Sequence, residues 1–167
     1  MRMFLRLIEA VVVIVRAAIV LLAAVMLVSL ALQVLMRYVF GEALSWTEEL
    51  AVSCFSWTML FAIALGVRDA IHVRMDLLID RLHGRARRLA ESLILAMICA
   101  FGLFLAWSGS NYLQDTQGMT SAAIGFPIGY LYAAAPVTGV LLALFALERI
   151  VQPVSQETVL PDQGGHP

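Results

Sequence analysis

Residues 17–36 read AAIVLLAAVMLVSLALQVLM, twenty residues without a charged side chain. A helix of about 20 apolar residues is long enough to cross the roughly 30 Å hydrocarbon core of a bilayer. Three more uncharged apolar stretches follow, at residues 50–67, 92–109 and 126–147. The sequence therefore predicts an all-α integral membrane protein with a four-helix membrane domain over residues 17–147.

The overall composition agrees with lipid as the solvent. The chain has 167 residues, of which 62% are hydrophobic and 14% charged, and its mean hydropathy is +0.90, whereas a soluble domain carries about 25% charged residues. The net charge of −1, without a basic block interleaved with aromatic residues, excludes nucleic acid as a partner. The first apolar run is too long for the core of a signal peptide, so we expect it to be retained.

The arginines predict how the spans are oriented. The connection 68–88 carries six arginines, the connection 37–49 carries one, and the connection 110–125 carries none. Basic connections stay on the cytoplasmic side of the membrane. We therefore expect a multi-pass membrane protein with both termini in the cytoplasm.

Three segments are expected to lie outside the spans. Residues 1–16 and 71–88 are amphipathic, with arginines along one face of each predicted helix. The first is expected to lie at the lipid headgroups, and the second either lies on anionic lipid or docks a partner. The polar tail, residues 148–167, is rich in Pro and Gly and is expected to be disordered.

The connection between the first two spans concentrates charge, within MRYVFGEALSWTEELAVSCF at residues 36–55. Ser45 and Glu48 match a capping box for the second span, and Trp46 is placed at headgroup depth. Arg37 is expected to pair with Glu48 or Glu49. A capped helix with a surface ion pair explains most of this pattern. However, so many charges at the membrane edge also fit a packed interface with another chain.

The spans themselves offer no reactive chemistry. No acid lies near the middle of a span, and all three histidines lie outside the spans, which disfavours proton coupling and haem ligation. Cys54 and Cys99 do not form a Cys-x-x-Cys pair, so neither a disulfide framework nor a metal site is expected from them. The polar residues of the spans are scattered and do not converge on a substrate site. We therefore expect no enzyme activity, no cofactor or metal, and no transport by this chain alone.

Pro136 interrupts the helical hydrogen bonding of the fourth span. It leaves one carbonyl without its helical donor, so a neighbouring helix is expected to cover the kink. Thr138 and Gly139 beside it predict a close helix–helix contact.

Three motifs carry a resemblance to a known family. They are LQVLMRYVFGEALSWTEELAVSCFSW at residues 32–57, GVRDAIHVRMDLLIDRL at 66–82 and MTSAAIGFPIGYLYAAAPVTG at 119–139. Together they resemble the small membrane subunit of TRAP (tripartite ATP-independent periplasmic) transporters, the DctQ-like family, over about residues 15–150. The resemblance implies a place in the bacterial inner membrane and a part in organic-acid uptake. A periplasmic binding protein would capture the solute, and a large, sodium-driven elevator subunit would move it. This chain would brace the large subunit as a scaffold.

The same resemblance implies two groups of partner-interface residues. Those expected at the periplasmic rim are Arg37, Trp46, Glu48 and Glu49, and those expected at the cytoplasmic rim are Arg68, His72, Arg74 and Asp76. Direct contact with the binding protein stays open. The alternative is a structural or regulatory four-span protein with a different membrane partner.

Overall fold

The computed structural model describes residues 2–42, 44–69, 85–121 and 125–151. The chain forms α1 (Arg2–Leu35), the π-helical turn η1 (Met36–Phe40), α2 (Ser45–Arg68), α4 (Arg85–Asp115), α5 (Gly129–Tyr132) and α6 (Ala134–Val151).

Four helical stretches are long and apolar enough to cross a membrane. They are Arg6–Phe40, Ser45–Arg68, Leu89–Asp115 and Gly129–Val151. The predicted spans 17–36, 50–67 and 92–109 lie inside the first three. These observations confirm the prediction of an all-α membrane protein with four spans.

The fourth span is interrupted near its start. The short helix α5 ends at Tyr132, and α6 begins at Ala134. Pro136 explains the break, because its ring clashes with the carbonyl four residues earlier, which belongs to Tyr132. A Cβ added to Gly109 of α4 would lie 2.8 Å from Cδ of Pro136. The backbone of α4 therefore lies directly against the break, as the sequence predicted.

The first helix differs from the prediction. Residues 1–16 were expected to form a separate interfacial helix, but α1 runs from Arg2 to Leu35 without a break. Neither Gly nor Pro interrupts this stretch, so the helical hydrogen bonds continue. At 1.5 Å per residue α1 is about 51 Å long, well beyond the roughly 30 Å of a hydrocarbon core. Its first turns therefore extend past the core or the whole helix is tilted.

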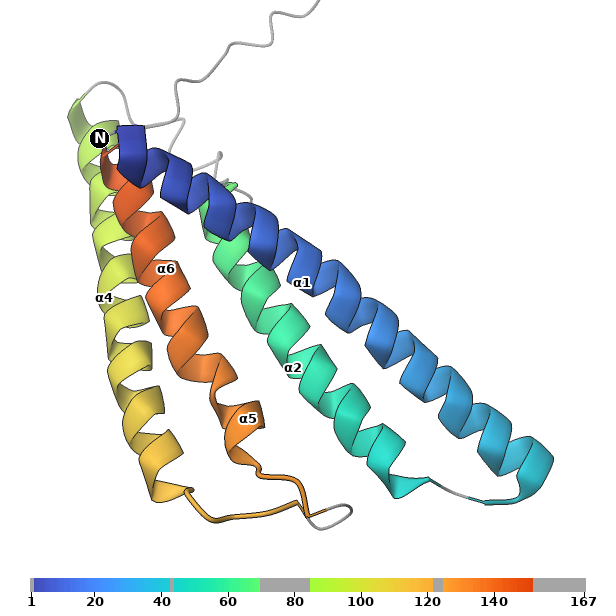
Figure 1. Ribbon diagram of the computed structural model, residues 1–167. Coiled ribbons are helices and arrows are strands. Elements are labelled where there is room, and N and C mark those ends of the chain that lie inside the picture. The colour runs from blue at the N-terminus through green and yellow to red at the C-terminus, as the bar shows by residue number, and fades with distance from the viewer. Residues whose placement is uncertain (1, 43, 70–84, 122–124, 152–167) are drawn as a thin grey trace, which may run out of the picture.

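The helices form two antiparallel hairpins, α1 with α2 and α4 with α5 and α6 (Figure 1). The contact of α2 with α6 joins them. The hairpins meet at the end where the N-terminus lies and spread apart toward the opposite end (Figure 1). We call these the inner end and the outer end, respectively.

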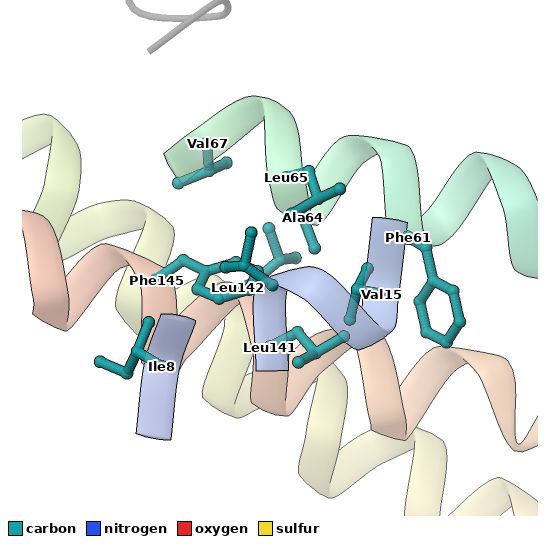
Figure 2. Close-up of a cluster of buried hydrophobic side chains, with 10 residues drawn as sticks. Ile8, Val15, Phe61, Ala64, Leu65, Val67, Leu141, Leu142 and Phe145 are labelled. Atoms are coloured by element: carbon teal, nitrogen blue, oxygen red, sulfur yellow. The ribbon is translucent and has the colours of Figure 1, made fainter. Parts of the chain in front are cut away.

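The buried core lies near the inner end (Figure 2). It collects apolar side chains from three helices, which are Ile8, Val12 and Val15 of α1, Phe61, Ala64, Leu65 and Val67 of α2, and Leu141, Leu142 and Phe145 of α6. Phe145 and Ile8 are fully buried. The first turns of α1 therefore fasten the two hairpins together.

The hairpin of α4 and α6 is held by direct backbone contact. A Cβ added to Gly139 would lie 2.5 Å from the amide nitrogen of Ala106 and 2.6 Å from the carbonyl oxygen of Gly102. Small residues of this kind let helix backbones approach closely in membranes. The prediction of close packing at Gly139 is confirmed.

Candidate partner interface

The connection at the outer end begins with a widened helical turn. Arg37 lies in η1, which is followed by its C-cap Gly41 with φ 72°, and the Gly41 amide donates to the Met36 carbonyl. This left-handed conformation favours glycine, and it reverses the chain within a few residues. The side chain of Arg37 is exposed, and Tyr38 beside it is 80% exposed.

The predicted ion pair of Arg37 does not form. Within the described ranges, the two salt bridges are Arg16 with Asp69 and Arg68 with Glu148. Arg37 and Glu48 are both exposed. Both residues therefore lie exposed at the edge of a membrane span, without an ion pair in the described part of the chain.

The predicted capping box is also wrong. Leu44 occupies the N-cap in an extended conformation, without a side-chain cap hydrogen bond, and Ser45 is already helical. The hydroxyl of the fully buried Thr47 donates to the Leu44 carbonyl over 2.7 Å. A buried hydroxyl needs a partner, and this bond draws Ser45 into the first turn, where its side chain no longer caps the helix.

Two contacts tie the outer parts of the hairpins together. Glu49, at the start of α2, accepts a hydrogen bond from the hydroxyl of Ser121, which lies between α4 and α5. Further along α2, the indole of Trp57 donates to the Tyr130 carbonyl over 3.0 Å. The second bond satisfies a carbonyl in the interrupted fourth span. Glu49 therefore acts within the chain, unlike its neighbour Glu48.

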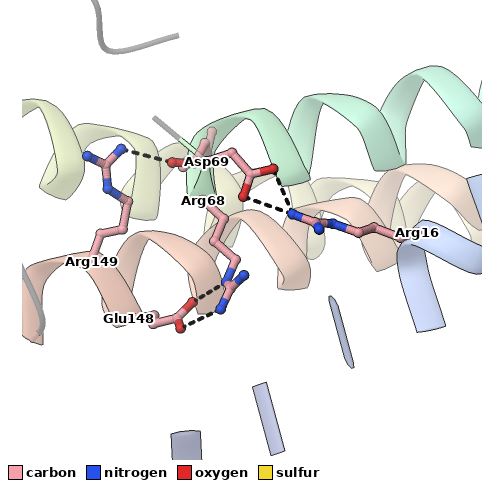
Figure 3. A network of polar contacts seen from close by, with 6 residues as sticks. Arg16, Arg68, Asp69, Glu148 and Arg149 are labelled. Atoms are coloured by element: carbon pink, nitrogen blue, oxygen red, sulfur yellow. Dashed lines mark hydrogen bonds and ion pairs between the residues drawn. The ribbon is translucent and has the colours of Figure 1, made fainter. Parts of the chain in front are cut away.

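The inner end carries a denser polar network (Figure 3). Arg68 donates to both carboxylate oxygens of Glu148, over 2.9 and 3.2 Å, and Arg149 donates to the Val67 carbonyl over 3.0 Å. The Arg68 and Glu148 side chains are only 24% and 11% exposed. Such bidentate pairs fix geometry as well as charge. The pair locks the end of α2 to the end of α6.

A second ion pair brings α1 into the same network. Arg16 donates to both oxygens of Asp69, over 3.3 and 3.1 Å. These side chains are 57% and 35% exposed, so the pair contributes little to stability. It nevertheless places Arg16 of α1 at the level of the α2 C-terminus.

The residues predicted for the cytoplasmic rim have different outcomes. Arg68 is bound to Glu148 within the chain, whereas His72, Arg74 and Asp76 lie outside the described residues. Sequence reasoning missed Glu148 as the partner of Arg68. The sequence did hold a signal for this pair. Arg68 and Glu148 each follow the last residues of an apolar span, and the second and fourth spans end on the same side of the membrane.

Aromatic residues mark the outer end of both hairpins. Those that are exposed there are Tyr38, Phe40, Trp46, Trp107, Tyr112, Phe126 and Tyr130. The tryptophan and tyrosine rings among these are amphipathic, and such rings concentrate at the membrane–water interface. Trp46 is exposed among these rings, and its position at headgroup depth stays a prediction.

The described residues hold no group of three or more His, Cys, Asp or Glu side chains that could bind a metal ion. The arrangement is instead that of a helical membrane protein whose charges gather at the two ends. The polar groups described above link helices to one another.

The comparison with protein families identifies this class more closely. Residues 26–156 match the family of tripartite ATP-independent periplasmic transporters, DctQ component. The chain belongs to this family and is a transporter component, a multi-pass protein of the inner membrane.

Curated relatives agree. The chain is 33% identical over 110 residues to the C4-dicarboxylate TRAP transporter small permease protein DctQ of Rhodobacter capsulatus, covering 65% of this chain and 48% of the relative. It is 30% identical over 122 residues to a putative TRAP transporter small permease protein of Haemophilus influenzae, covering 71% and 73%. It thus spans about half the length of the first relative.

A third relative has a different architecture. The sialic acid TRAP transporter permease protein SiaT of Haemophilus influenzae is 30% identical over 112 residues, which cover 66% of this chain but only 18% of the relative. A segment similar to this chain is therefore part of a much longer permease in that protein.

Proposed function

We propose that this chain is the small scaffold subunit of a sodium-coupled uptake transporter for organic acids. It braces a large elevator-type membrane subunit and does not transport alone. A periplasmic binding protein delivers the solute. The orientation that goes with this role has both termini in the cytoplasm, which the arginine-rich connection 68–88 supports.

One observation carries the proposal. Arg37 and Glu48 are exposed and form no ion pair within the described part of the chain, although both lie at the edge of a span. Charges at a membrane edge that become desolvated need specific partners. A second membrane subunit supplies such partners, whereas a chain alone in lipid leaves both groups at the headgroups.

The third relative supports a large partner. In SiaT, the segment similar to this chain belongs to one polypeptide with the rest of the permease. Segments joined in one protein and separate in another commonly act together in both. We therefore assign this chain a one-to-one complex with a large permease subunit.

Co-purification tests this function. A tagged chain is expressed with and without the large permease subunit of its system and purified in detergent. We expect a one-to-one complex. Arg37→Ala is expected to reduce the co-purified large subunit more than tenfold, because truncating one member of a desolvated charge pair costs about 2 kcal/mol or more.

Arg16→Ala is the matched control, because Arg16 lies on α1, the helix that leads into the η1 turn of Arg37, but is paired within the chain. It is expected to leave the complex intact. If Arg37→Ala lowers the yield of the folded chain as much as that of the complex, Arg37 stabilises the fold and not the interface. A wild-type chain that purifies well and ignores the large subunit favours the alternative, a structural or regulatory protein with another partner.

A further inference from the structure

The packing between the two hairpins is uneven along their length. The buried residues of the core begin at Phe61 on α2 and at Leu141 on α6, both toward the inner end (Figure 2). The bidentate bond of Arg68 with Glu148 closes the same end. Toward the outer end the hairpins spread apart (Figure 1). Because helices in lipid are held together by close packing and polar bonds, the inner end is the fixed end of the pair.

Each hairpin is held together by its own contacts. In the second hairpin, a Cβ added to Gly139 of α6 would lie 2.5 Å from the amide nitrogen of Ala106 of α4. Nearer the outer end, a Cβ added to Gly109 of α4 would lie 2.8 Å from Cδ of Pro136. In the first hairpin, α1 packs against α2. Motion at the outer end is therefore motion of one hairpin relative to the other.

The connection between α4 and α5 is closed by its own backbone. The amide of Ser121 donates to the Phe126 carbonyl over 2.7 Å, and the amide of Ile128 donates to the Met119 carbonyl over 3.2 Å. These bonds hold Ser121 in a fixed turn at the outer end of the second hairpin. A side-chain bond from Ser121 to another element therefore ties the whole hairpin to that element.

Glu49 of the first hairpin receives such a bond. It lies half-buried in the first turns of α2 and accepts a hydrogen bond from the Ser121 hydroxyl. Hydrogen bonds to an ionised group are about twice as strong as those between neutral groups. We call the contact of Glu49 with Ser121 the outer clasp.

The outer clasp acts at a long distance from the fixed end. Glu49 is 19 residues from Arg68 along α2, or about 28 Å at 1.5 Å per residue. The bond of Trp57 to the Tyr130 carbonyl lies closer to the fixed end, 11 residues or about 16 Å from Arg68. A rotation about the inner end moves the outer clasp farther than the Trp57 bond. The outer clasp is therefore the contact that opposes such a rotation most effectively.

We propose that the outer clasp holds the two hairpins in a closed arrangement, and that they open about the inner end when it is released. The core and the bond of Arg68 with Glu148 form the pivot. Hinges of this kind let packed elements move as rigid bodies. In the closed arrangement the outer clasp sets the distance between the two connections of the outer end. The opening is a property of the chain alone, so it does not depend on the proposed function.

Distances between spin labels on the full chain in lipid nanodiscs test the outer clasp. The outer pair joins Val52 of α2 with Gln114 of α4, and the inner pair joins Ile63 of α2 with Leu93 of α4, all four being exposed positions. Each is changed to cysteine and labelled in a chain whose two native cysteines are replaced by alanine. Double electron–electron resonance then gives the distribution of each distance.

Glu49→Ala is expected to lengthen the outer distance and to leave the inner distance unchanged. The ratio of open to closed chains should rise about tenfold, as loss of a hydrogen bond to a charged group predicts. Ser121→Ala removes the same bond from the other hairpin and should give the same result, whereas Ser121→Thr keeps the hydroxyl and should stay closed. Glu42→Ala is the matched control, because Glu42 is an exposed carboxylate of the same end, and it should change neither distance.

Two results would overturn the proposal. An outer distance that stays the same in both Glu49→Ala and Ser121→Ala shows that the outer clasp does not hold the hairpins closed. An inner distance that lengthens as much as the outer one shows that the hairpins separate along their whole length, without a pivot. Ser121 lies outside the helices, so Ser121→Ala tests the outer clasp without a change in any span.

Discussion

Replacement of Gly139 by alanine tests the contact between α4 and α6. The new Cβ would lie 2.5 Å from the amide nitrogen of Ala106 and 2.6 Å from the carbonyl oxygen of Gly102. Both are backbone atoms, so neither can rotate away. Because ordinary contacts begin near 3.4 Å, the two helices would have to separate by roughly 0.9 Å.

The cost follows from that separation. A gap of 0.5–1 Å forfeits about a quarter to a half of the dispersion energy of each contact, and overpacked sites lose about 1–3 kcal/mol. Alanine also favours the helix over glycine by up to about 1 kcal/mol, which offsets part of the loss. We therefore expect a net destabilisation of about 2 kcal/mol, or about 4–8 °C in melting temperature.

The assay is thermal unfolding of the purified chain in mild detergent, followed by tryptophan fluorescence. Gly129→Ala is the matched control, because its added Cβ meets only the end of the Leu113 side chain at 3.4 Å. This control is expected to melt within about 1 °C of the wild type. Equal melting temperatures for Gly139→Ala and the wild type would refute the claim that backbone contact at Gly139 holds this hairpin.

The polar contacts between the hairpins give further predictions. Arg68→Ala leaves the carboxylate of Glu148 without its bidentate partner, and we expect it to lower the free energy of unfolding by about 2–3 kcal/mol, measured by thermal unfolding in detergent. Arg16→Ala, which removes the exposed ion pair, is expected to cost less than about 1 kcal/mol in the same assay, and an equal loss would contradict this ranking. Trp57→Phe removes the indole donor to the Tyr130 carbonyl and is expected to cost about 1 kcal/mol. Hydrogen exchange should then rise at the amides of α5, and unchanged exchange there would contradict the proposed role of that bond.

The candidate interface was only partly predictable from its local sequence. The motif of Ser45 and Glu48 predicts a capping box, but in the structure α2 begins at Ser45 with Leu44 as its N-cap, and the buried hydroxyl of Thr47 bonds the Leu44 carbonyl. The local sequence also predicts an ion pair between Arg37 and Glu48 or Glu49. The structure instead leaves Arg37 exposed and directs Glu49 toward Ser121, 72 residues away.

Hydropathy and length determined the four spans by themselves. An uncharged run of about twenty residues has one stable form in lipid, a helix that satisfies its own backbone hydrogen bonds, so no tertiary information was needed. The sequence also determined the break at Pro136. Proline lacks an amide hydrogen and its ring clashes with the carbonyl four residues earlier, so both effects arise within one helical turn. The family motifs likewise lie in continuous stretches of sequence.

Only the tertiary structure decided which charges are satisfied within the chain. The bond of Arg68 with Glu148 joins positions 80 residues apart, and no local pattern encodes such a distance. The continuity of α1 into the core was also decided there, because Ile8, Val12 and Val15 are buried only once α2 and α6 lie against them. A charged side chain at the end of a span has several possible partners, and the packing of the two hairpins determines which of them it contacts.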